Sequence, residues 1–319
     1  MIESIKLPRD SSTDLVSVII PTYQDTEYLT DGLESLAAQT YENIEALVVD
    51  SSGDDWLRSL AENSSRVRYF HQEPNGVSSA RNRAIKESSG KFITFLDADD
   101  YYAEEKIEAQ VNALQGPTGI VYSDVYDIHT DGTKEYRTAM PISDPDEHHL
   151  FFFRQDGIAG NIHTSSVMVA ADCLGDHRFC ESLSSKEDFH MWARLFRDCR
   201  VDRIEQPLVF VRLREDSISS NPQFMYEGGI GAIDRLAAEY SEFEPYAEER
   251  KRVERYNLGR ELLTSDGDHL SEARSVLKTS LLEDRYYRAV VMLAISLLPF
   301  GHSAAVSRLD QLREQVLSS

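Results

Sequence analysis

The stretch KFITFLDADD, residues 91–100, runs from apolar and β-branched side chains straight into three carboxylates, Asp97, Asp99 and Asp100. Its first six residues have the composition of a buried strand. Two carboxylates about 4 Å apart repel each other by roughly 4 kcal/mol at an effective dielectric constant of 20. Water, a proton or a cation must relieve that repulsion, so the stretch raises the question of what these acids hold.

Similar strand patterns precede this stretch, and helical patterns lie between them. Strands are predicted over 15–23, 44–50, 67–72 and 91–96. Helices are predicted over 26–39 and 76–90, the second of them ended by Gly90. Alternating strands and helices indicate an α/β fold with a mostly parallel sheet and right-handed crossovers. Ligands bind beyond the carboxyl ends of such strands, so Asp50 and Asp97 are expected to face one crevice.

The rest of the chain divides near residue 220. Before that point the patterns predict a helix, a hairpin, a strand, an amphipathic helix and a strand, over 103–114, 119–138, 161–170, 186–198 and 201–213. Pro207 indicates an edge or a bulge in the last of these. From residue 221 onward Ala, Leu, Glu and Arg recur at helical spacing. We therefore expect one domain over 1–220 and an α-helical extension of four or five helices over 221–319.

The chain is strongly acidic, with 55 Asp and Glu against 33 Lys and Arg and a formal charge of −22. Such a surface repels phosphate backbones, so no nucleic-acid partner is expected. Only eight of the basic residues are Lys. An acid-rich, Lys-poor surface suits solubility in concentrated salt, which predicts a halophilic source, although an ordinary acidic enzyme has the same composition.

Cysteine usage and hydropathy bear on location. Cys173, Cys180 and Cys199 have no metal-binding spacing, and their odd number fits a reducing compartment. The polar N-terminus lacks the apolar stretch of a signal peptide, which predicts a cytoplasmic protein. The apolar run 289–300 is shorter than the ~20 residues that a membrane-spanning helix needs. We interpret it as a buried helix, with a helix on a membrane surface as the alternative.

The acid cluster has two interpretations. Oxygen ligands at this density suit Mg²⁺ or Mn²⁺ rather than zinc. Alternatively, the acids occupy a strand-to-helix turn, where they favour the start of the next helix. A turn at Asn75-Gly76 precedes a helix whose free N–H groups suit an anion, and Arg81 and Arg83 add positive charge there. Together these features favour a metal-bound diphosphate.

Four segments in this order resemble the successive motifs of family 2 glycosyltransferases of the GT-A fold. They are VSVIIPTYQDTEYLTDGLESLAAQTYENIEALVVDSSGDD, PNGVSSARNRA, FITFLDADD and KEDFHMWARL. The resemblance covers roughly residues 15–220. It implies a GT-A domain that binds a nucleotide-sugar donor, while the helical part from 221 adds no support.

The resemblance assigns donor-binding roles residue by residue. Asp50 matches the acid that hydrogen-bonds the base, Asp97 the first acid of the motif, and Asp99 the last, which is usually the metal ligand. Arg81 is expected beside the nucleotide. The segment expected to hold the base and ribose is Pro21, Thr22 and Tyr23.

The resemblance also matches Asp188, in KED, to the general base, with capping of the helix as the alternative role. One base and one metal ion predict a single displacement with inversion at the anomeric carbon. The chain departs from the family pattern at Arg214, which stands where a His is usual. Arg214 cannot ligate a metal, but it is able to bind the diphosphate as a fixed cation.

The resulting hypothesis is an inverting, metal-dependent glycosyltransferase that uses a UDP-, GDP- or dTDP-linked sugar. Its acceptor is expected to be a glycan or a lipid-linked sugar, with peripheral association at the inner face of the membrane. A catalytically silent sugar-nucleotide-binding module is the first alternative, although the intact Asp97, Asp99 and Asp188 argue against it. A nucleotidyltransferase would need a Gly-rich basic loop after the first strand, where this chain has PTYQDTEY.

Overall fold

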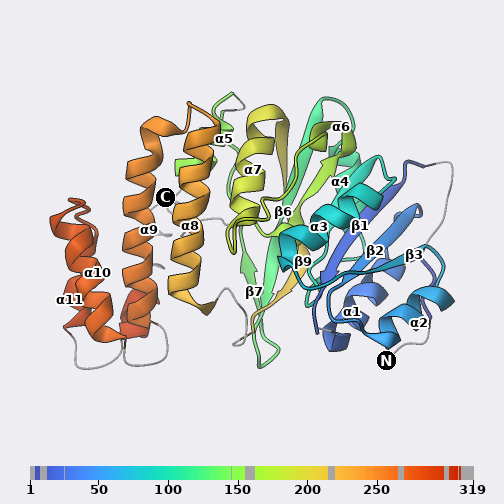
Figure 1. The fold of residues 1–319 in the computed structure, drawn as a ribbon, viewed down its shortest axis with the longest axis horizontal. Helices are drawn as coiled ribbons and strands as arrows, with labels where there is room; N and C mark the ends of the chain where they lie inside the picture. Colours follow the sequence, from blue (N-terminus) through green and yellow to red (C-terminus); the bar gives the residue numbers. More distant parts are fainter. Residues whose placement is uncertain are drawn as a thin grey trace. The chain divides into compact units, whose positions relative to one another are not determined.

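The structure, a computed structural model, describes residues 4–7, 13–24, 26–144, 146–154, 162–214, 220–264, 269–297, 302–307 and 309 (Figure 1). The chain divides into two compact units. The first consists of residues 1–153 and 158–215, and the second of residues 154–157 and 216–319. The two domains predicted over 1–220 and 221–319 stay a prediction.

A mixed sheet forms the centre of the first unit. Its parallel part consists of β1 (Val16–Thr22), β2 (Ile44–Asp50), β3 (Val67–His71) and β4 (Phe92–Phe95), in the order β3-β2-β1-β4. Every residue of β1, β2 and β4 is buried, as expected for strands covered on both faces. The predicted parallel α/β arrangement is therefore confirmed for this part of the sheet.

The second half of the sheet is more varied than the sequence indicates. It continues in the order β8-β6-β9-β5, with β7 paired to β6. The strands are β5 (Tyr101–Tyr102), β6 (Thr118–Ile128), β7 (Lys134–Arg137), β8 (Met168–Ala170) and β9 (Arg200–Arg212). Here β6 and β9 are parallel, whereas β8, β7 and β5 pair antiparallel with their neighbours.

Helices cover both faces of the sheet. The core of one face contains residues of α1 (Thr26–Ala37), α2 (Asp55–Asn63) and α4 (Lys106–Ala113). On the other face lie α3 (Gly76–Glu87), against β1 and β2, and α7 (Glu187–Asp198). The ring of Trp192 in α7 packs 5.6 Å from that of Phe95, where β4 ends. The helix α7 and the end of β4 thereby share one core.

Two local predictions are wrong. The helix α3 ends at Glu87, and Gly90 instead lies beside β1, where a Cβ would come within 2.6 Å of the Ser17 nitrogen. The strand predicted over 161–170 is limited to β8 in the described residues, after a 3₁₀ turn, η1 (Thr164–Ser166). The His163 side chain accepts the Ser165 N–H at 3.3 Å, a local bond that favours a turn over a strand.

The predicted hairpin and the predicted irregularity at Pro207 are both present. The strands β6 and β7 are joined through a turn in which Gly132 has a φ of 83°. Pro207 lies opposite Asp124, and the register of β6 and β9 shifts on both sides of Asp124. Because β9 lies between β6 and β5, Pro207 marks a bulge rather than an edge.

Four helices form most of the described part of the second unit. They are α8 (Pro222–Glu239), α9 (Glu244–Thr264), α10 (Leu270–Leu282) and α11 (Ala289–Ser296), each packed on the next (Figure 1). The sequence predicts a buried helix for this run, but α11 is only partly buried. Ala289 and Met292 are buried, but Val290 is 49% and Val291 45% exposed. None of the helices in the described ranges has the length and apolar character needed to cross a bilayer.

A disulfide joins Cys173 to Cys199, contrary to the expectation of reduced cysteines. Cys173 belongs to α6 (Ala171–Leu174), and Cys199 is the residue that ends α7. Gly119 provides the space, because a Cβ at this position would lie 2.9 Å from the Cβ of Cys199. Cys180 keeps a free thiol. The sequence spacing gave no sign of this pairing.

Reduction of this disulfide is expected to destabilise the first unit. Closing a loop of 26 residues stabilises a fold by roughly 3 kcal/mol. We expect a Cys173→Ser, Cys199→Ser double variant to unfold at lower urea concentration than the oxidised protein, and dithiothreitol to have no further effect on it. Cys180→Ser is the control and should unfold like the unchanged chain in both conditions. Intact-mass measurement showing two reduced thiols at these positions in oxidised protein would contradict the assignment.

Candidate active site

The acid loop, residues 97–100, follows β4 and folds into a tight turn. The Asp100 N–H donates to the Asp97 carbonyl at 3.0 Å. The turn separates the three carboxylates into different surroundings. The Asp100 side chain is 2% exposed, whereas those of Asp97 and Asp99 are 26% and 29% exposed. The crowding seen in the sequence is thus relieved by giving each acid its own partners.

Arg81, on α3, joins the acid loop to α7. Its guanidinium donates to Asp97 at 2.7 Å and to Glu187 at 2.7 Å, and its side chain is only 5% exposed. The ring of Phe179 lies 5.2 Å from the guanidinium carbon. A buried charge of this kind is tolerated only when it is paired and hydrogen-bonded, which both carboxylates provide. Arg81 therefore links three segments that are far apart in the sequence.

The pKa values of Asp97 and Glu187, the two carboxylates that Arg81 binds, are shifted in opposite directions. Burial alone would raise the pKa of Asp97, but the nearby Arg81 and His163 hold it below its usual range. Burial and the neighbouring Asp188 raise the pKa of Glu187, and this outweighs the opposing effect of Arg81. Asp97 is therefore the firmly ionised partner of Arg81.

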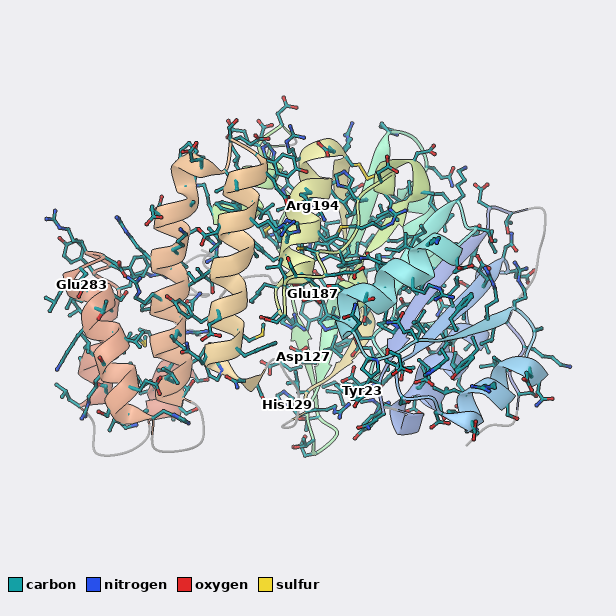
Figure 2. All side chains as sticks on the ribbon, in the orientation of Figure 1. Tyr23, Asp127, His129, Glu187, Arg194 and Glu283 are labelled. Carbon is teal, nitrogen blue, oxygen red and sulfur yellow. A yellow bond between two sulfur atoms is a disulfide. The ribbon has the colours of Figure 1, made fainter. Side chains whose placement is uncertain are left out.

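Asp188 lies in the first turn of α7, next to Glu187. Lys186, not Asp188, occupies the position that caps the helix, and it has a left-handed φ of 58°. Asp188 accepts the Phe189 N–H at 2.7 Å and is partly exposed. Glu187 is labelled in Figure 2. Because Arg81 donates to both Glu187 and Asp97, the start of α7 is fixed relative to the acid loop.

Asp99 lies beside Arg212, the last residue of β9, and Arg214, two positions further along the chain. Arg214 approaches the Asp99 carboxylate at 3.6 Å, and Arg212 donates from Nε to the Asp99 carbonyl at 2.9 Å. Both guanidinium groups lie over the ring of Tyr28, at 5.3 and 4.9 Å. One partly exposed carboxylate suits Mg²⁺ or Mn²⁺ that also binds waters and substrate phosphates. Arg214 offers a positive charge but no metal ligand.

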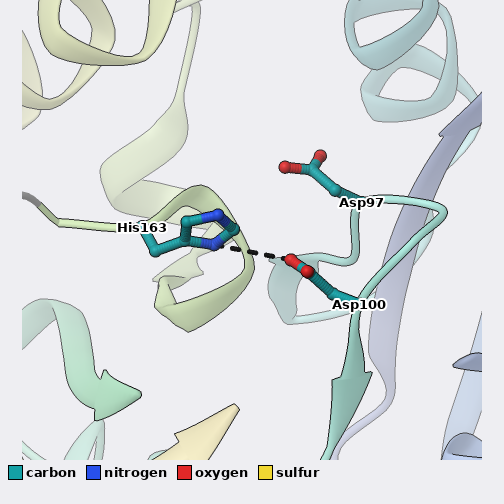
Figure 3. A group of neighbouring side chains, drawn as sticks. All are labelled: Asp97, Asp100 and His163. Carbon is teal, nitrogen blue, oxygen red and sulfur yellow. Dashed lines mark ion pairs between the residues drawn. The ribbon is translucent and has the colours of Figure 1, made fainter. Parts of the chain in front are cut away.

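A second group of possible metal ligands includes the buried Asp100. One ligand atom each from Asp97, Asp100 and His163 lies within 4.8 Å of the others (Figure 3). These atoms already have protein partners, because Arg81 donates to Asp97 and the Ser165 hydroxyl donates to Asp100. Burial also lowers the pKa of His163 to about 4, so its imidazole is neutral at pH 7. Asp97 and His163 are about as exposed as Asp99, so exposure does not decide between the two sets, and Asp99 stays the predicted metal ligand.

The carboxyl end of β1 carries the residues predicted to hold the nucleotide. Tyr23, labelled in Figure 2, is 52% exposed, while Thr22 is 5% exposed and pairs in register with Asp50 on β2. The buried polar atoms Thr22 Oγ1, Gln72 Nε2 and Ser78 Oγ have no hydrogen-bond partner among the described residues. Buried polar groups normally have partners, so a polar ligand fits the neighbourhood of these strand ends.

Asp50 is engaged more fully than predicted. Its carboxylate accepts the Ser52 N–H and hydroxyl, the Asp54 N–H and the Tyr69 hydroxyl, at 2.6 to 2.8 Å. These bonds outweigh burial and hold the pKa of Asp50 below its usual range. Four bonds use the full acceptor capacity of a carboxylate. A hydrogen bond to a base would have to replace one of them.

Residues 17–172 match glycosyl transferase family 2. The chain belongs to this family. The matched range contains the acid loop, Asp50 and Arg81. Asp188 and Arg214 lie beyond it.

Curated relatives of the chain carry glycosyltransferase names. An uncharacterized glycosyltransferase of Rickettsia felis is 31% identical over 225 residues, which are 68% of this chain and 37% of that protein. A similar protein of Rickettsia bellii is 32% identical, over 57% of this chain and 27% of its own length. The chain thus spans roughly a third of the length of these relatives. The E. coli UDP-Glc:alpha-D-GlcNAc-diphosphoundecaprenol beta-1,3-glucosyltransferase WfgD is 29% identical, over 65% of this chain and 80% of WfgD.

Solved structures show the fold. The crystal structure of S. aureus TarS 1–349 has a TM-score of 0.58 at 18% identity, covering 86% of this chain and 87% of that one. The mannosyltransferase PcManGT of Pyrobaculum calidifontis has a TM-score of 0.55 at 15% identity, covering 95% and 89%. The predicted fold class, GT-A with a helical C-terminal region, is confirmed.

The structure adds residues that the family 2 motifs did not single out. Glu187 precedes the predicted base and was visible in the same KED segment, but nothing in the sequence linked it to Arg81. Ser165 contacts the acid loop from 65 or more residues away. The roles predicted for Pro21, Thr22, Tyr23, Asp50, Arg81, Asp97, Asp99, Asp188 and Arg214 stay predictions.

Replacement of Arg81 is expected to destabilise the first unit strongly. Arg81→Met leaves the buried Glu187 and the partly exposed Asp97 without their cation, which costs about 3 kcal/mol. Arg83→Met is the control. Arg83 is 43% exposed, pairs with Glu87 at 3.6 Å and lies 5.5 Å from the Phe70 ring, so its effect should stay within about 0.5 kcal/mol. Urea unfolding at pH 7 measures both.

The same pair of variants predicts a pH dependence. The pKa of Asp97 is lowered by folding, so its stabilisation is present above its unfolded pKa and is lost as pH falls through its folded pKa. The pKa of Glu187 is raised, so Glu187 takes up a proton first. We expect the deficit of Arg81→Met to begin to shrink above the ordinary Glu pKa of about 4.3, where Glu187 takes up its proton, and to go on shrinking as pH falls through the lowered pKa of Asp97. A deficit that stays constant from pH 7 to pH 3 would show that charge pairing is not its cause.

Proposed function

We propose that the chain is an inverting glycosyltransferase that moves a sugar from a nucleotide-diphosphate donor to an acceptor hydroxyl. The observation that carries the proposal is the Asp97–Arg81–Glu187 triad, which holds the acid loop and the start of α7 together. A donor-binding acid loop and a proton acceptor must be fixed relative to each other for a single displacement. Membership of family 2 and the names of the relatives support this assignment.

Asp188 is the proposed general base. Its place in the first turn of α7 fixes its backbone, and its partial exposure leaves the carboxylate able to meet an acceptor hydroxyl. The acceptor oxygen attacks the anomeric carbon as its proton passes to Asp188, and the bond to the nucleoside diphosphate breaks on the opposite side. One displacement with one base inverts the anomeric configuration.

The leaving diphosphate is proposed to lie near Asp99 and Arg214. Bound at Asp99, Mg²⁺ or Mn²⁺ neutralises charge that develops on the diphosphate. Arg214, 3.6 Å from Asp99, adds a fixed positive charge whose planar donors suit phosphate oxygens. The ribose and base would extend toward the ends of β1 and β2, where Pro21, Thr22, Tyr23 and Asp50 lie.

The donor is proposed to be a UDP-, GDP- or dTDP-linked sugar. TarS has been solved with UDP-GlcNAc, and the Pyrobaculum mannosyltransferase with GDP-Man and Mn²⁺. WfgD acts on a diphosphoundecaprenol-linked acceptor, and the Erwinia amylovora relative AmsB is named for amylovoran biosynthesis. By analogy we propose a glycan or lipid-linked acceptor in the assembly of a surface polysaccharide or glycoprotein, in the cytoplasm, and we keep a halophilic source as a prediction.

Substitution of the proposed base should separate binding from transfer. Asp188→Asn is expected to lower transfer at least a hundredfold and to change donor affinity less than threefold, because the base acts on the acceptor proton. Asp198→Asn, at the other end of α7, is the matched control and should leave both unchanged. Donor hydrolysis with Mn²⁺ and calorimetric binding measure the two properties. Equal loss of both in Asp188→Asn would disprove its role, and absence of hydrolysis in the unchanged chain would favour a silent binding module.

Peripheral membrane association is proposed through the exposed face of α11. Val290 and Val291 are about half exposed, and Leu297, just after the helix, is 75% exposed. Changing Val290 and Val291 together to Asp should weaken flotation with zwitterionic vesicles roughly tenfold or more, since two apolar side chains no longer enter the lipid. Ile142→Asp, at an exposed apolar position of the first unit, is the control. No flotation of the unchanged chain at any salt concentration would refute the association.

A further inference from the structure

The hydroxyl of Ser165, in η1, lies between two groups of the acid loop. It accepts the Asp97 N–H at 3.1 Å and donates to Asp100 Oδ2 at 2.6 Å. Ser165 is completely buried. A hydroxyl has one proton to donate and can accept at the same time, so a single side chain bridges both ends of the turn.

The opposite side of Asp100 is bound by β9. Its Oδ1 accepts the backbone N–H of Arg212 at 3.4 Å, and the Arg212 side chain donates to the Asp99 carbonyl at 2.9 Å. His163 also faces Asp100, with its Nδ1 3.5 Å from Oδ2 (Figure 3). The acid loop therefore lies between η1 and the end of β9, and Asp100 forms hydrogen bonds with both.

The Ser165 contact also opposes the mutual repulsion of the acids. Asp100 is buried, and it lies in the same tight turn as the carboxylates of Asp97 and Asp99. The Ser165 hydroxyl donates to Asp100 at 2.6 Å, a shorter bond than the one at 3.4 Å from the Arg212 N–H. Without it, the loop can lower its energy by moving the carboxylates apart or toward water.

We infer that Ser165 is a positioning residue for donor binding. Its hydroxyl holds the Asp97 backbone where the side chain reaches Arg81, and it holds Asp100 in the turn that presents Asp99. Ser165 acts through these acids. The inference rests on the proposed function, since it assumes that the acid loop binds the donor.

Ser166 provides a matched control within the same turn. It is also completely buried, but its hydroxyl donates to the His163 carbonyl at 2.7 Å rather than to the acid loop. Ser165→Ala and Ser166→Ala each remove one buried hydroxyl from η1. A merely structural role predicts similar losses of melting temperature and of affinity for the two variants.

Calorimetric binding of UDP, GDP and dTDP with Mn²⁺ to the full chain tests the inference. Ser165→Ala should bind about tenfold more weakly than the unchanged chain, the effect of losing a hydrogen bond to a charged group. Ser166→Ala should stay within twofold. Ser165→Cys keeps the volume with a weaker donor and should be intermediate, and it replaces Ser165→Ala as the test if the alanine variant does not fold. Mn²⁺ affinity, followed by electron paramagnetic resonance, should fall in the same order.

A double-variant cycle with Asp100→Asn identifies the partner. If Ser165 acts through Asp100, Ser165→Ala should weaken binding by less than twofold when Asp100→Asn is already present. Full additivity, equal losses in the two serine variants, or unchanged affinity in Ser165→Ala would each overturn the inference while leaving the proposed function intact. If the unchanged chain binds none of the three nucleotides, the proposed function fails and this inference with it.

Discussion

The ion pairs of Arg81 are the interaction on which the arrangement of the site depends. A guanidinium with 5% exposure would be strongly unfavourable alone, and Asp97 and Glu187 would be unfavourable without it. Each of the three comes from a different segment: α3, the loop after β4 and the start of α7. Packing around Phe95, Trp192 and Phe179 brings these segments together, and the charges then select one geometry.

The three carboxylates of the acid loop lie close together, and each is stabilised by a different kind of partner. Asp97 has a buried cation, Asp100 has a hydroxyl and a backbone N–H, and Asp99 remains partly in water beside Arg214. Each environment stabilises a different balance of charge and accessibility. Asp97 and Asp99 are exposed to a similar extent, but the cation beside Asp97 is buried whereas Arg214 beside Asp99 is partly exposed.

Much of the fold could be predicted from local patterns. Continuous β-branched runs predicted β1 and β2, and Asp131-Gly132 predicted the turn of a hairpin, because these signals depend on neighbouring residues. Gly90 could not be interpreted correctly, since its role depends on how closely Ser17 approaches from another strand. For the same reason Glu187, Ser165 and the Cys173–Cys199 pair were missed or misjudged: each has its partner at a distance along the chain that no spacing rule covers. Asp50 was located correctly, but its four hydrogen bonds depend on Tyr69 and on a turn whose shape the sequence did not reveal.

The disulfide between α6 and the end of α7 also matters for how the protein is prepared. Material from a strongly reducing host and material folded under oxidising conditions would share one sequence but differ in one covalent bond, next to Gly119 and at the far end of the helix that carries Asp188. Kinetic constants from the two preparations would describe two chemical species. The oxidation state of each batch therefore belongs among its defining properties, alongside purity and concentration.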